Sequence, residues 1–498
     1  MPVKILTATQ VHELDNYSIK QEKISSLELM ERASVQFFTC LTSIVEKDKR
    51  ILVFCGKGNN GGDGLAIARM LLEANYDVKV FVVEHSPKPS KDFALNQKRI
   101  DKSKINFVKT AKQIPLIKKT DVIVDAIFGS GLSRAVDGIS AAVINTINKS
   151  KAEVYSVDVP SGLFCDKLNN SKDVIVQSTY TFTFHAPKFS FFFSVNGKYV
   201  PDFVLNEIGL NKSYEEKLPS DYFFITKDFA KSFFKKREKF SHKGNYGHAL
   251  IAAGSFGKMG AAVLATKAAL RSGAGLVTAL VPACGYDILQ TSAPEAMCLV
   301  DGDSHLFSVP DVSRFNSIAV GPGVRTNSSA INFVYELLKL NKPLVLDADA
   351  LNIISANKNY LNLIPKGSVL TPHPGEFKRL VGEWKDDEEK LEKQKQFSKK
   401  YGVVVVLKGA HTSVSSVDGK VYFNSTGNAG MAKGGSGDVL TGIITALIAQ
   451  NYSGLHAAII AVYVHGLAGD YAKRELGETA MKASDIIYYL PKVFKSFE

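Results

Sequence analysis

The chain has 498 residues, of which 45% are hydrophobic and 22% are charged, and its formal net charge is +12. This composition excludes a disordered or collagen-like chain, and the length predicts two domains of about 100 to 250 residues each. The positive charge is compatible with anionic partners such as nucleotides, nucleic acids or membranes, but it does not indicate which of them binds.

The cysteines and the apolar stretches indicate a cellular location. The 5 cysteines are scattered without metal-type spacing, as expected of reduced thiols. The N-terminus has no signal-peptide apolar region. The most apolar stretch, residues 455–469, includes His465 and is shorter than the roughly 20 residues that a membrane span needs. We therefore predict a cytoplasmic protein without a membrane partner.

The first part of the chain alternates between helical and strand-like segments. An amphipathic helix is predicted over 25–46, opened by a capping box of Ser25 and Glu28. The apolar runs that follow are "RILVFCG", "DVKVFVVE", "DVIVDAIFG", "AEVYSVDVP" and "TYTFTFHAP". Runs this apolar are typical of parallel strands buried on both faces. A Rossmann-like, doubly wound domain is predicted over residues 1–212.

Polar residues follow several of these strands. The segments concerned are "CGKGNNGGDG", "DAIFGSGLSRAVDG" and "DVPSG". They supply Asn59, Asn60, Asp63, Asp125, Asp158 and Ser161. Ligands bind at the carboxyl ends of parallel strands, where glycines let backbone N–H groups approach a phosphate and side-chain oxygens suit a hard cation or a ribose hydroxyl. A lone Asp after a strand is more often a helix cap, but three polar strand ends in one sheet favour a binding site.

A change of composition over 212–224 predicts a linker, after which strands and helices alternate again. A helix rich in small residues, suited to close packing, is predicted over 260–275. The apolar runs are "GHALIAAGS", "SIAVGPG", "PLVLDADALN", "SVLTPHPGEF" and "VVVVLKGAHT". They predict a second α/β domain over 225–498.

The segment "AGMAKGGSGDVLTG" puts Gly434, Gly435, Ser436 and Gly437 at the start of a helix. Backbone N–H groups and the helix dipole at such a position favour a phosphate. Asp438 follows in the first turn, where we expect the dipole to keep its carboxylate ionised. It is either a capping acid or a base directed at a hydroxyl that faces the bound phosphate.

These motifs resemble a known family along nearly the whole chain. "CGKGNNGGDG", "VDAIFGSGL" and "DVPSG" are similar to the NAD(P)H-hydrate epimerase domain. "KGNYGHALIAAGS", "GPG", "DADALN", "TPHPGE", "VLKGAHT" and "GMAKGGSGDVLTG" are similar to the ribokinase-like NAD(P)H-hydrate dehydratase domain. Their order resembles the bifunctional NAD(P)H-hydrate repair enzymes.

The resemblance implies an epimerase site in the N-terminal domain, with Asp125 as a catalytic residue. It implies that a potassium ion is held by Asn60, Asp125 and Ser161. The implied substrate contacts are Asn59, Asn60, Gly61, Gly62, Asp63, Gly129, Ser130, Gly131, Leu132, Ser133, Arg134, Ala135 and Asp158.

For the C-terminal domain the resemblance implies a dehydratase site that uses ADP and magnesium, with Asp438 as the catalytic base. The implied substrate contacts are Ala262, Gly323, His373 and Asp438, and the implied ADP contacts are Lys408, Gly409, Ala410, His411, Thr412 and Gly437. The implied substrates are NADH and NADPH hydrated at C6 of the nicotinamide ring. The first domain would interconvert the R and S epimers, and the second would dehydrate the S epimer while ADP is converted to AMP and phosphate.

Other functions fit parts of the sequence. The C-terminal domain could be a small-molecule kinase fused to a non-catalytic nucleotide-binding module, since its motifs alone allow this. A nucleic-acid partner would explain the positive charge, but no platform of aromatic and basic residues accompanies that charge, so none is predicted. A homo-oligomer is expected, because fused metabolic enzymes are commonly symmetric assemblies.

Overall fold

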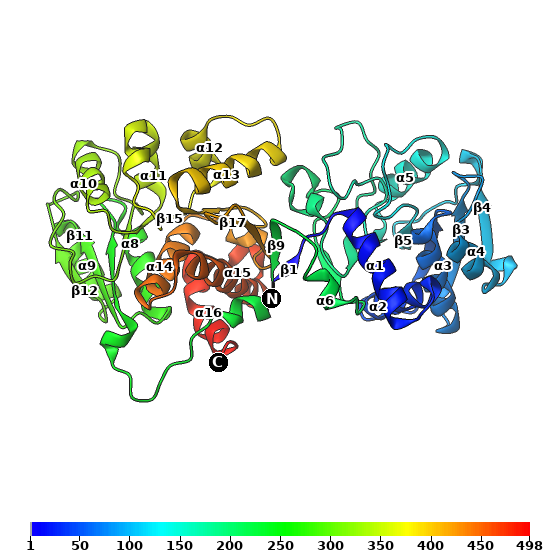
Figure 1. Ribbon diagram of the computed structural model, residues 1–498, viewed down its shortest axis with the longest axis horizontal. Helices are drawn as coiled ribbons and strands as arrows, with labels where there is room; N and C mark the ends of the chain where they lie inside the picture. The colour runs from blue at the N-terminus through cyan, green and yellow to red at the C-terminus, as the bar shows by residue number, and fades with distance from the viewer. Residues whose placement is uncertain (1) are drawn as a thin grey trace. The chain divides into compact units, whose positions relative to one another are not determined.

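The computed structural model describes residues 2–498, which form two compact units (Figure 1). The first is Lys4–Ser220, and the second is Asp221–Glu498 together with Val3. The boundary lies inside the stretch 212–224 that was expected to be a linker. This stretch contains helix α6 (Lys212–Glu215) and the start of strand β9 (Tyr222–Ile225). The functional ranges 1–212 and 225–498 remain predictions.

The first unit is built on a 7-stranded sheet with the order β4-β3-β2-β5-β6-β7-β8, and all neighbouring strands are parallel. Its strands are β2 (Arg50–Cys55), β3 (Asp77–Val83), β4 (Ile105–Val108), β5 (Val122–Ala126), β6 (Glu153–Val157), β7 (Tyr180–Phe184) and β8 (Phe203–Asn206). The strand order reverses between β2 and β5, as in Rossmann-like sheets. The predicted doubly wound α/β fold is confirmed.

Helices cover both faces of this sheet. They are α1 (Ala8–Glu22), α2 (Ser26–Thr42), α3 (Asn59–Glu73), α4 (Lys91–Lys98) and α5 (Gly138–Ser150). Phe37 of α2 and Leu65 of α3 pack with Val53 in one core, whereas Val143 of α5 packs with Phe54 in the other. The predicted capping box of α2 is confirmed, because Ser25 and Glu28 exchange backbone-to-side-chain hydrogen bonds.

The second unit contains an 11-stranded sheet with the order β1-β9-β18-β17-β16-β15-β14-β13-β10-β11-β12. The additional strands are β1 (Val3–Lys4), β10 (His248–Ala252), β11 (Leu276–Val281), β12 (Met297–Val300), β13 (Ser317–Val320), β14 (Leu344–Leu346), β15 (Val369–Leu370), β16 (Val404–Leu407), β17 (Ser413–Ser415) and β18 (Val421–Asn424). The strands from β16 to β12 are parallel, and β17 is antiparallel to both of its neighbours. The carboxyl ends of the parallel strands therefore share one edge.

The helices of the second unit pack closely where small residues allow it. They are α7 (Lys227–Ser232), α8 (Met259–Arg271), α9 (Tyr286–Ser292), α10 (Ser328–Lys339), α11 (Ala348–Ala356), α12 (Pro374–Val381), α13 (Asp387–Tyr401), α14 (Ser436–Ala449), α15 (Gly454–Ala480) and α16 (Ala483–Lys495). The small-residue helix α8 packs against α14, as its composition predicts. A Cβ on Gly442 of α14 would lie 2.1 Å from the carbonyl oxygen of Ala265.

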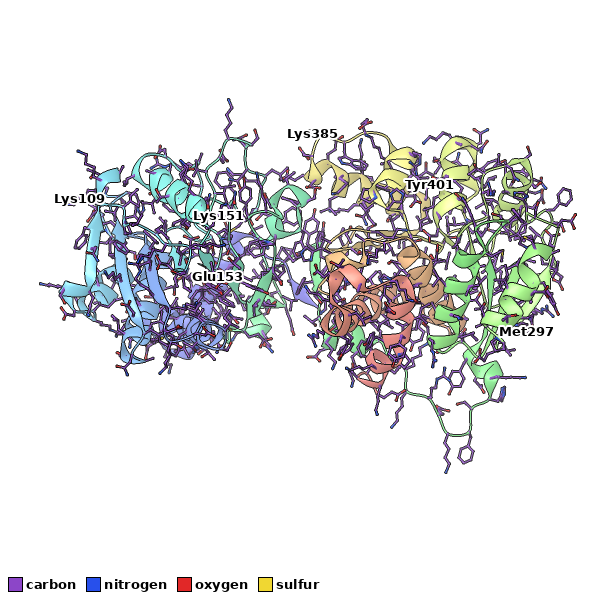
Figure 2. The ribbon with its side chains drawn as sticks, turned by 180° about the vertical axis from the view of Figure 1, so that it is seen from behind. Lys109, Lys151, Glu153, Met297, Lys385 and Tyr401 are labelled. Atoms are coloured by element: carbon purple, nitrogen blue, oxygen red, sulfur yellow. The ribbon has the colours of Figure 1, made fainter. Side chains whose placement is uncertain are left out.

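Charged side chains are found on the surface, as the composition predicts. Lys109 and Lys385 lie exposed on the surface (Figure 2), where water solvates their charges. All 5 cysteines are free thiols. Within residues 2–498, no helix is long and apolar enough to cross a bilayer.

The contact between α8 and α14 predicts the effect of Gly442→Ala. The added methyl group would meet the backbone at Ala265, so we expect the second unit to lose about 1–3 kcal/mol of stability. Gly260→Ala is the matched control, because a Cβ there meets nothing within 4 Å and alanine is the better helix former. Scanning calorimetry of both variants measures the difference. An unchanged unfolding temperature for Gly442→Ala would mean that the two helices can separate at no cost.

Candidate active sites

A cavity of about 1060 Å³ lies in the first unit, at the carboxyl ends of β2, β5, β6 and β7. Of the predicted substrate contacts, those that line it are Asn59, Asn60, Asp63, Gly129, Ser130, Gly131, Leu132, Ser133, Arg134 and Asp158. The structure thus brings together residues from three strand ends that are up to about a hundred positions apart in the chain. Gly61, Gly62 and Ala135 are not among the residues that line the cavity.

Gly61 and Gly62 are closely surrounded by neighbouring atoms. A Cβ on Gly61 would lie 1.9 Å from the carbonyl oxygen of Gly56, and one on Gly62 would lie 2.8 Å from the sulfur of Met30. Both glycines are buried. Both positions lie in the first turn of α3 and leave no room for a larger side chain, and their contact with substrate through the backbone stays a prediction.

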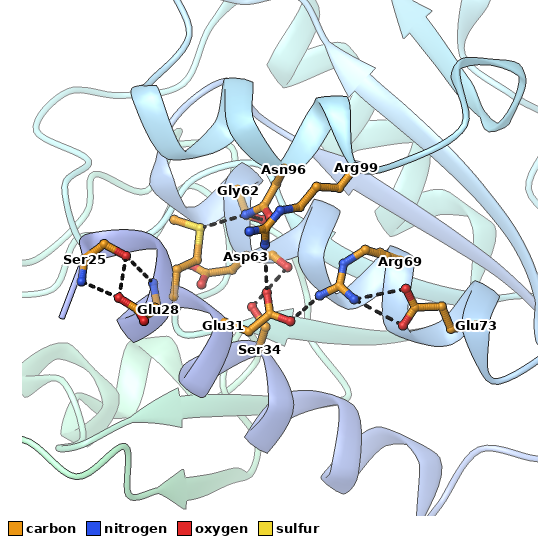
Figure 3. Close-up of polar contacts among 11 residues, drawn as sticks. Ser25, Glu28, Glu31, Ser34, Gly62, Asp63, Arg69, Glu73, Asn96 and Arg99 are labelled. Carbon is orange, nitrogen blue, oxygen red and sulfur yellow. Dashed lines mark hydrogen bonds and ion pairs between the residues drawn. The ribbon is translucent and has the colours of Figure 1, made fainter.

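The N-terminal part of α3 is held in place by its neighbours (Figure 3). Asn96 of α4 donates a hydrogen bond from Nδ2 to the carbonyl oxygen of Gly62 at 3.2 Å. Glu31 of α2 forms ion pairs with Arg69 of α3 and with Arg99 after α4. These contacts fix the helix that carries Asn60 and Asp63 into the cavity.

Asp125 and Ser161 form a buried cluster behind the cavity. The Asp125 carboxylate has no exposed surface and accepts hydrogen bonds from the Ser161 hydroxyl at 2.5 Å, the Ser161 backbone N–H at 2.8 Å and the Ser156 hydroxyl at 3.0 Å. Burial raises the pKa of Asp125, and the hydrogen bonds offset this only in part. Because Asp125 does not line the cavity, it could take part in catalysis only through neighbouring residues.

Asn60 reaches toward the same region. Its side chain lies against Gly129, in the loop whose Phe128 backbone N–H donates to the Ser161 hydroxyl at 2.8 Å. The Asn60 Nδ2 atom is buried and has no hydrogen-bond partner among the described residues. A half-turn of the amide would present Oδ1 instead. The three predicted potassium ligands thus surround one loop and offer oxygen donors, as a hard cation requires.

The cavity also contains residues that the sequence did not single out as functional. Asp15 and His12 come from α1, and Lys188 comes from the segment after β7. Lys188 is only 3% exposed and forms an ion pair with Asp158, with its Nζ 2.8 Å from Oδ1. The capping box of Thr7 and Gln10 could have revealed α1, but nothing in the sequence shows that this helix faces a site.

The second unit has a polar cluster at the carboxyl ends of β14 and β16. Lys408 donates a hydrogen bond to Oδ1 of Asp347 at 2.9 Å, and Thr441 of α14 donates to Oδ2 of the same carboxylate at 2.7 Å. Glu376 of α12 lies 3.9 Å from Lys408. Burial raises the pKa of Asp347, but the charge of Lys408 and the Thr441 hydrogen bond outweigh it and hold that pKa below its usual value.

The predicted phosphate-binding turn lies beside this cluster. Helix α14 begins at Ser436 with Gly435 as its N-cap, at a φ of 95° that favours glycine. A Cβ on Gly437 would lie 3.2 Å from Nζ of Lys408. The start of a helix and a partly buried ammonium group together form a favourable place for a phosphate, as the sequence predicts for these positions.

Asp438 differs from expectation in its ionisation. Burial raises its pKa to about 7, and the nearby carboxylates of Asp347, Asp349 and Glu376 add to this effect, while Lys408 opposes it. The expectation that the helix dipole keeps Asp438 ionised is therefore wrong at neutral pH. A pKa near 7 suits a general base better than a fully ionised acid would, because it matches the pH of catalysis.

The remaining predicted contacts of the second unit differ in exposure and in hydrogen bonding. His373 is half exposed and caps α12, and its Nδ1 accepts a hydrogen bond from Gly375 at 3.0 Å. Gly409 and Ala410 are exposed, and Thr412 exchanges hydrogen bonds with Gly409. His411 contacts the carbonyl oxygen of Asn424 through Nδ1 at 3.2 Å.

The structure separates Ala262 from its neighbour Ala261, and the contact of Ala262 with substrate stays a prediction. Ala262 has no exposed surface, whereas a Cβ on Gly323 would lie 3.3 Å from the Cβ of Ala261. Consecutive residues of a helix are rotated by about 100°, so the two alanines cannot face the same side. The side chain that faces Gly323 is that of Ala261.

Asp347, Glu376 and Thr441 were not among the predicted site residues. Asp347 and Glu376 lie in the segments "DADALN" and "TPHPGE", so an acid after a strand was the available signal. Thr441 is three residues after Asp438, which places both on one side of α14.

Comparisons with known proteins match both units. A family model described as NAD(P)H-hydrate dehydratase matches residues 249–492, and the YjeF-related protein N-terminus matches residues 26–190. The chain is 36% identical to the bifunctional NAD(P)H-hydrate repair enzyme of Moorella thermoacetica, over 99% of this chain and 97% of the relative. It is 31% identical to the enzyme of the same description from Escherichia coli, over 94% of this chain and 89% of the relative.

Among solved structures, the chain is similar to the ADP/ATP-dependent NAD(P)H-hydrate dehydratase of Bacillus subtilis, co-crystallised with ATP and Mg²⁺. The two are 32% identical with a TM-score of 0.48, and the match covers 55% of this chain and 98% of that chain.

The proposed phosphate-binding turn predicts different effects on ADP affinity for two neighbouring substitutions. Gly437→Val would direct a side chain toward Lys408, so we expect ADP binding to weaken at least tenfold. Asp438→Asn leaves the backbone N–H groups in place and serves as the matched control, with ADP affinity close to that of the unmodified protein. Calorimetric titration of both variants with ADP checks this. Equal affinity for Gly437→Val and the unmodified protein would mean that the phosphates bind elsewhere.

Proposed function

Because the chain belongs to the family of bifunctional NAD(P)H-hydrate repair enzymes, we infer that it converts hydrated NADH and NADPH back to NADH and NADPH in two steps. It epimerises the R and S forms of the hydrate, and it dehydrates the S form at the expense of ADP, which becomes AMP and phosphate. We assign epimerisation to residues 1–212 and dehydration to residues 225–498. The protein is thus both an isomerase and a lyase.

The observation that supports dehydration most directly is the position of Asp438. Hydroxide leaves C6 of the nicotinamide ring poorly, and transfer of a phosphoryl group from ADP to the C6 hydroxyl makes a better leaving group. Asp438 accepts the hydroxyl proton, while Lys408 and the N–H groups at the start of α14 stabilise negative charge on the transferring phosphoryl group. Phosphate then leaves C6 as C5 loses a proton.

Magnesium would enter this site with the nucleotide. Asp347 and Glu376 are carboxylates beside Lys408, and Mg²⁺ is commonly held by one or two carboxylates together with substrate phosphates. The part of the chain that is described, residues 2–498, holds no group of three or more His, Cys, Asp or Glu side chains arranged for a metal. The phosphates of ADP would therefore supply most of the ligands, and the ion would supply positive charge to the phosphoryl group.

Potassium would bind in the first unit between Asn60, Asp125 and Ser161. The support is electrostatic, because neutral donors leave the pKa of the buried Asp125 raised, whereas the cation Lys408 lowers that of the buried Asp347. A monovalent cation beside Asp125 would supply the missing positive charge. We propose that it orders the loop from Ile127 to Ser133 around the substrate.

The substrates thus proposed are NADHX, NADPHX and ADP. A cytoplasmic location, a homo-oligomeric state and the lack of nucleic-acid or membrane partners remain predictions. The alternative, a small-molecule kinase fused to a non-catalytic module, would release a phosphorylated product. Dehydration instead restores the absorbance of the reduced nicotinamide and releases AMP, which distinguishes the two.

We predict that the purified protein restores NADH absorbance from a mixture of both hydrate epimers when ADP is present. Asp438→Asn should slow this step by about 10²- to 10⁴-fold, as expected for loss of a general base. In the unmodified protein the rate should rise with pH through about 7, because Asp438 must be deprotonated to act. Epimer interconversion in Asp438→Asn, followed by chromatography, is the control and should be unchanged. Full dehydration by Asp438→Asn would make this residue only a capping acid.

For the first unit we predict that Asp125→Ala abolishes epimerisation and leaves dehydration of the S epimer within about twofold. Removing the carboxylate takes away the negative charge that would hold potassium and the acceptor that holds Ser161. The unmodified protein should also lose epimerisation when potassium is replaced by a bulky organic cation. If Asp125→Ala stops both reactions in a folded protein, the division into two independent sites is wrong.

A further inference from the structure

We propose that Asp158, positioned by Lys188, and Asp15 form an acid–base pair that epimerises the hydrate by breaking and re-forming the bond between C6 and N1. This inference rests on the epimerase activity proposed for the first unit and deepens it. The ligand concerned is the hydrated nicotinamide ring, whose C6 carries both a hydroxyl group and the ring nitrogen.

Asp158 presents one oxygen to the cavity and has the other fixed. Its Oδ1 accepts hydrogen bonds from the Thr183 hydroxyl at 3.2 Å and the Phe184 backbone N–H at 3.1 Å, and it pairs with Lys188 at 2.8 Å. Among the described residues, none donates a hydrogen bond to Oδ2. Since Asp158 lines the cavity, this oxygen is available to a substrate hydroxyl.

Lys188 is a positioning residue for Asp158. It is 3% exposed, and its ammonium group also donates to the carbonyl oxygens of Phe184 at 3.2 Å and Ala186 at 3.1 Å. These contacts fix the ammonium group at the side of Asp158. A buried ammonium without a carboxylate partner would be costly, so the pair keeps the carboxyl group of Asp158 in one position beside Lys188.

Asp15 supplies a proton donor from a different element. Helix α1 brings it to the same cavity, where it is half-buried. Burial raises the pKa of Asp15 to about 6, and the negative charge of Asp158 adds to this, while Lys188, His185 and His12 oppose it. A second carboxyl group, that of Asp63 on α3, also faces this group, and burial raises its pKa as well. Asp15 therefore holds its proton to a higher pH than an exposed carboxyl group does, as a proton donor requires.

The backbone supports a functional reading of Asp158. Its φ is 64°, in the left-handed region that residues other than glycine rarely adopt. His185, at the end of the neighbouring strand β7, has a φ of 63°. Such conformations persist where the surrounding structure enforces them, and they concentrate at active sites. Here they direct two strand-end side chains into one cavity.

The reaction balances without any co-reactant. Asp158 takes the proton of the C6 hydroxyl, the oxygen lone pair forms a C6 aldehyde, and the electrons of the C6–N1 bond pass to N1. Asp15 gives a proton to the ring nitrogen. Rotation about the C5–C6 bond turns the other face of the aldehyde toward N1, and N1 then attacks C6. The proton on N1 returns to Asp15, and Asp158 returns its proton to the new hydroxyl oxygen.

Breaking C6–N1 suits this cavity better than breaking C6–O. Expelling hydroxide requires activation, which the second unit supplies with ADP. The nitrogen is conjugated with the ring carboxamide and leaves with no more help than a proton. The side chains of Asp15, Asp158 and Lys188 provide proton transfer and nothing that would activate the oxygen as a leaving group.

The test measures interconversion of purified R and S epimers by the full-length protein. ADP is left out, so that dehydration does not occur. Asp158→Asn keeps the size of the side chain and tolerates the left-handed φ, and it should lower kcat by about 10²- to 10⁴-fold. Asp15→Asn should lower kcat by a comparable factor and remove the fall in rate as pH rises through about 6. Asp48→Asn, an exposed carboxylate of the same unit, is the matched control.

Lys188 is tested by rescue. Lys188→Met should lower kcat more than it changes KM, and Lys188→Arg should restore part of the loss because it returns a cation. Dehydration of the S epimer with ADP, unchanged in every variant, verifies that each protein is folded. Wild-type rates in both Asp158→Asn and Asp15→Asn would overturn the pair. No epimerisation by the unmodified protein would instead overturn the proposed function itself.

The bond that breaks is tested with oxygen-18 water. Ring opening keeps the C6 oxygen, so epimerisation by the enzyme should proceed without incorporating solvent oxygen, after subtraction of the uncatalysed reaction. Incorporation of one solvent oxygen in each epimerisation would mean that C6–O breaks, and it would overturn the ring-opening step.

Discussion

A carboxylate buried at the end of a parallel strand is costly unless donors surround it, and each unit is organised around one such group. In the first unit this is Asp125, with hydroxyl and backbone N–H donors. In the second it is Asp347, with an ammonium group and a hydroxyl. The donors come from neighbouring strand ends and loops, so satisfying the carboxylate also brings those segments together at one edge of the sheet.

The nature of the donors sets the chemistry that each edge can support. Lys408 is positioned by Asp347, and its charge is then directed at the start of α14, where a phosphate would bind. Burial is the main cause of the raised pKa of Asp438, and the carboxylate of Asp347 adds to it because like charges oppose one another. A base with a pKa near neutrality is thus a consequence of burial and of the acids around the lysine, rather than of the helix that carries Asp438.

The sequence was sufficient where a pattern has one local meaning. Continuous apolar runs became parallel strands, the Ser25 capping box opened α2, and the glycine turn before Asp438 opened α14. It was insufficient where the outcome depends on distant segments. The close approach of Gly61 to Gly56, the rotation of Ala262 into the core and the proximity of α1 to Asp158 are set by tertiary packing, which no local pattern encodes. The ionisation of Asp438 belongs to the same class, since it depends on acids from other strands.

The two proposed sites differ in charge because they would act on different bonds of the same carbon. Cleavage between C6 and oxygen needs a phosphoryl donor, and in the second unit Lys408 and the start of α14 would bind that donor. Cleavage between C6 and nitrogen needs only proton transfer, and the first unit offers carboxyl groups with one buried lysine. Separate sheets let each edge keep the charge that its own bond requires.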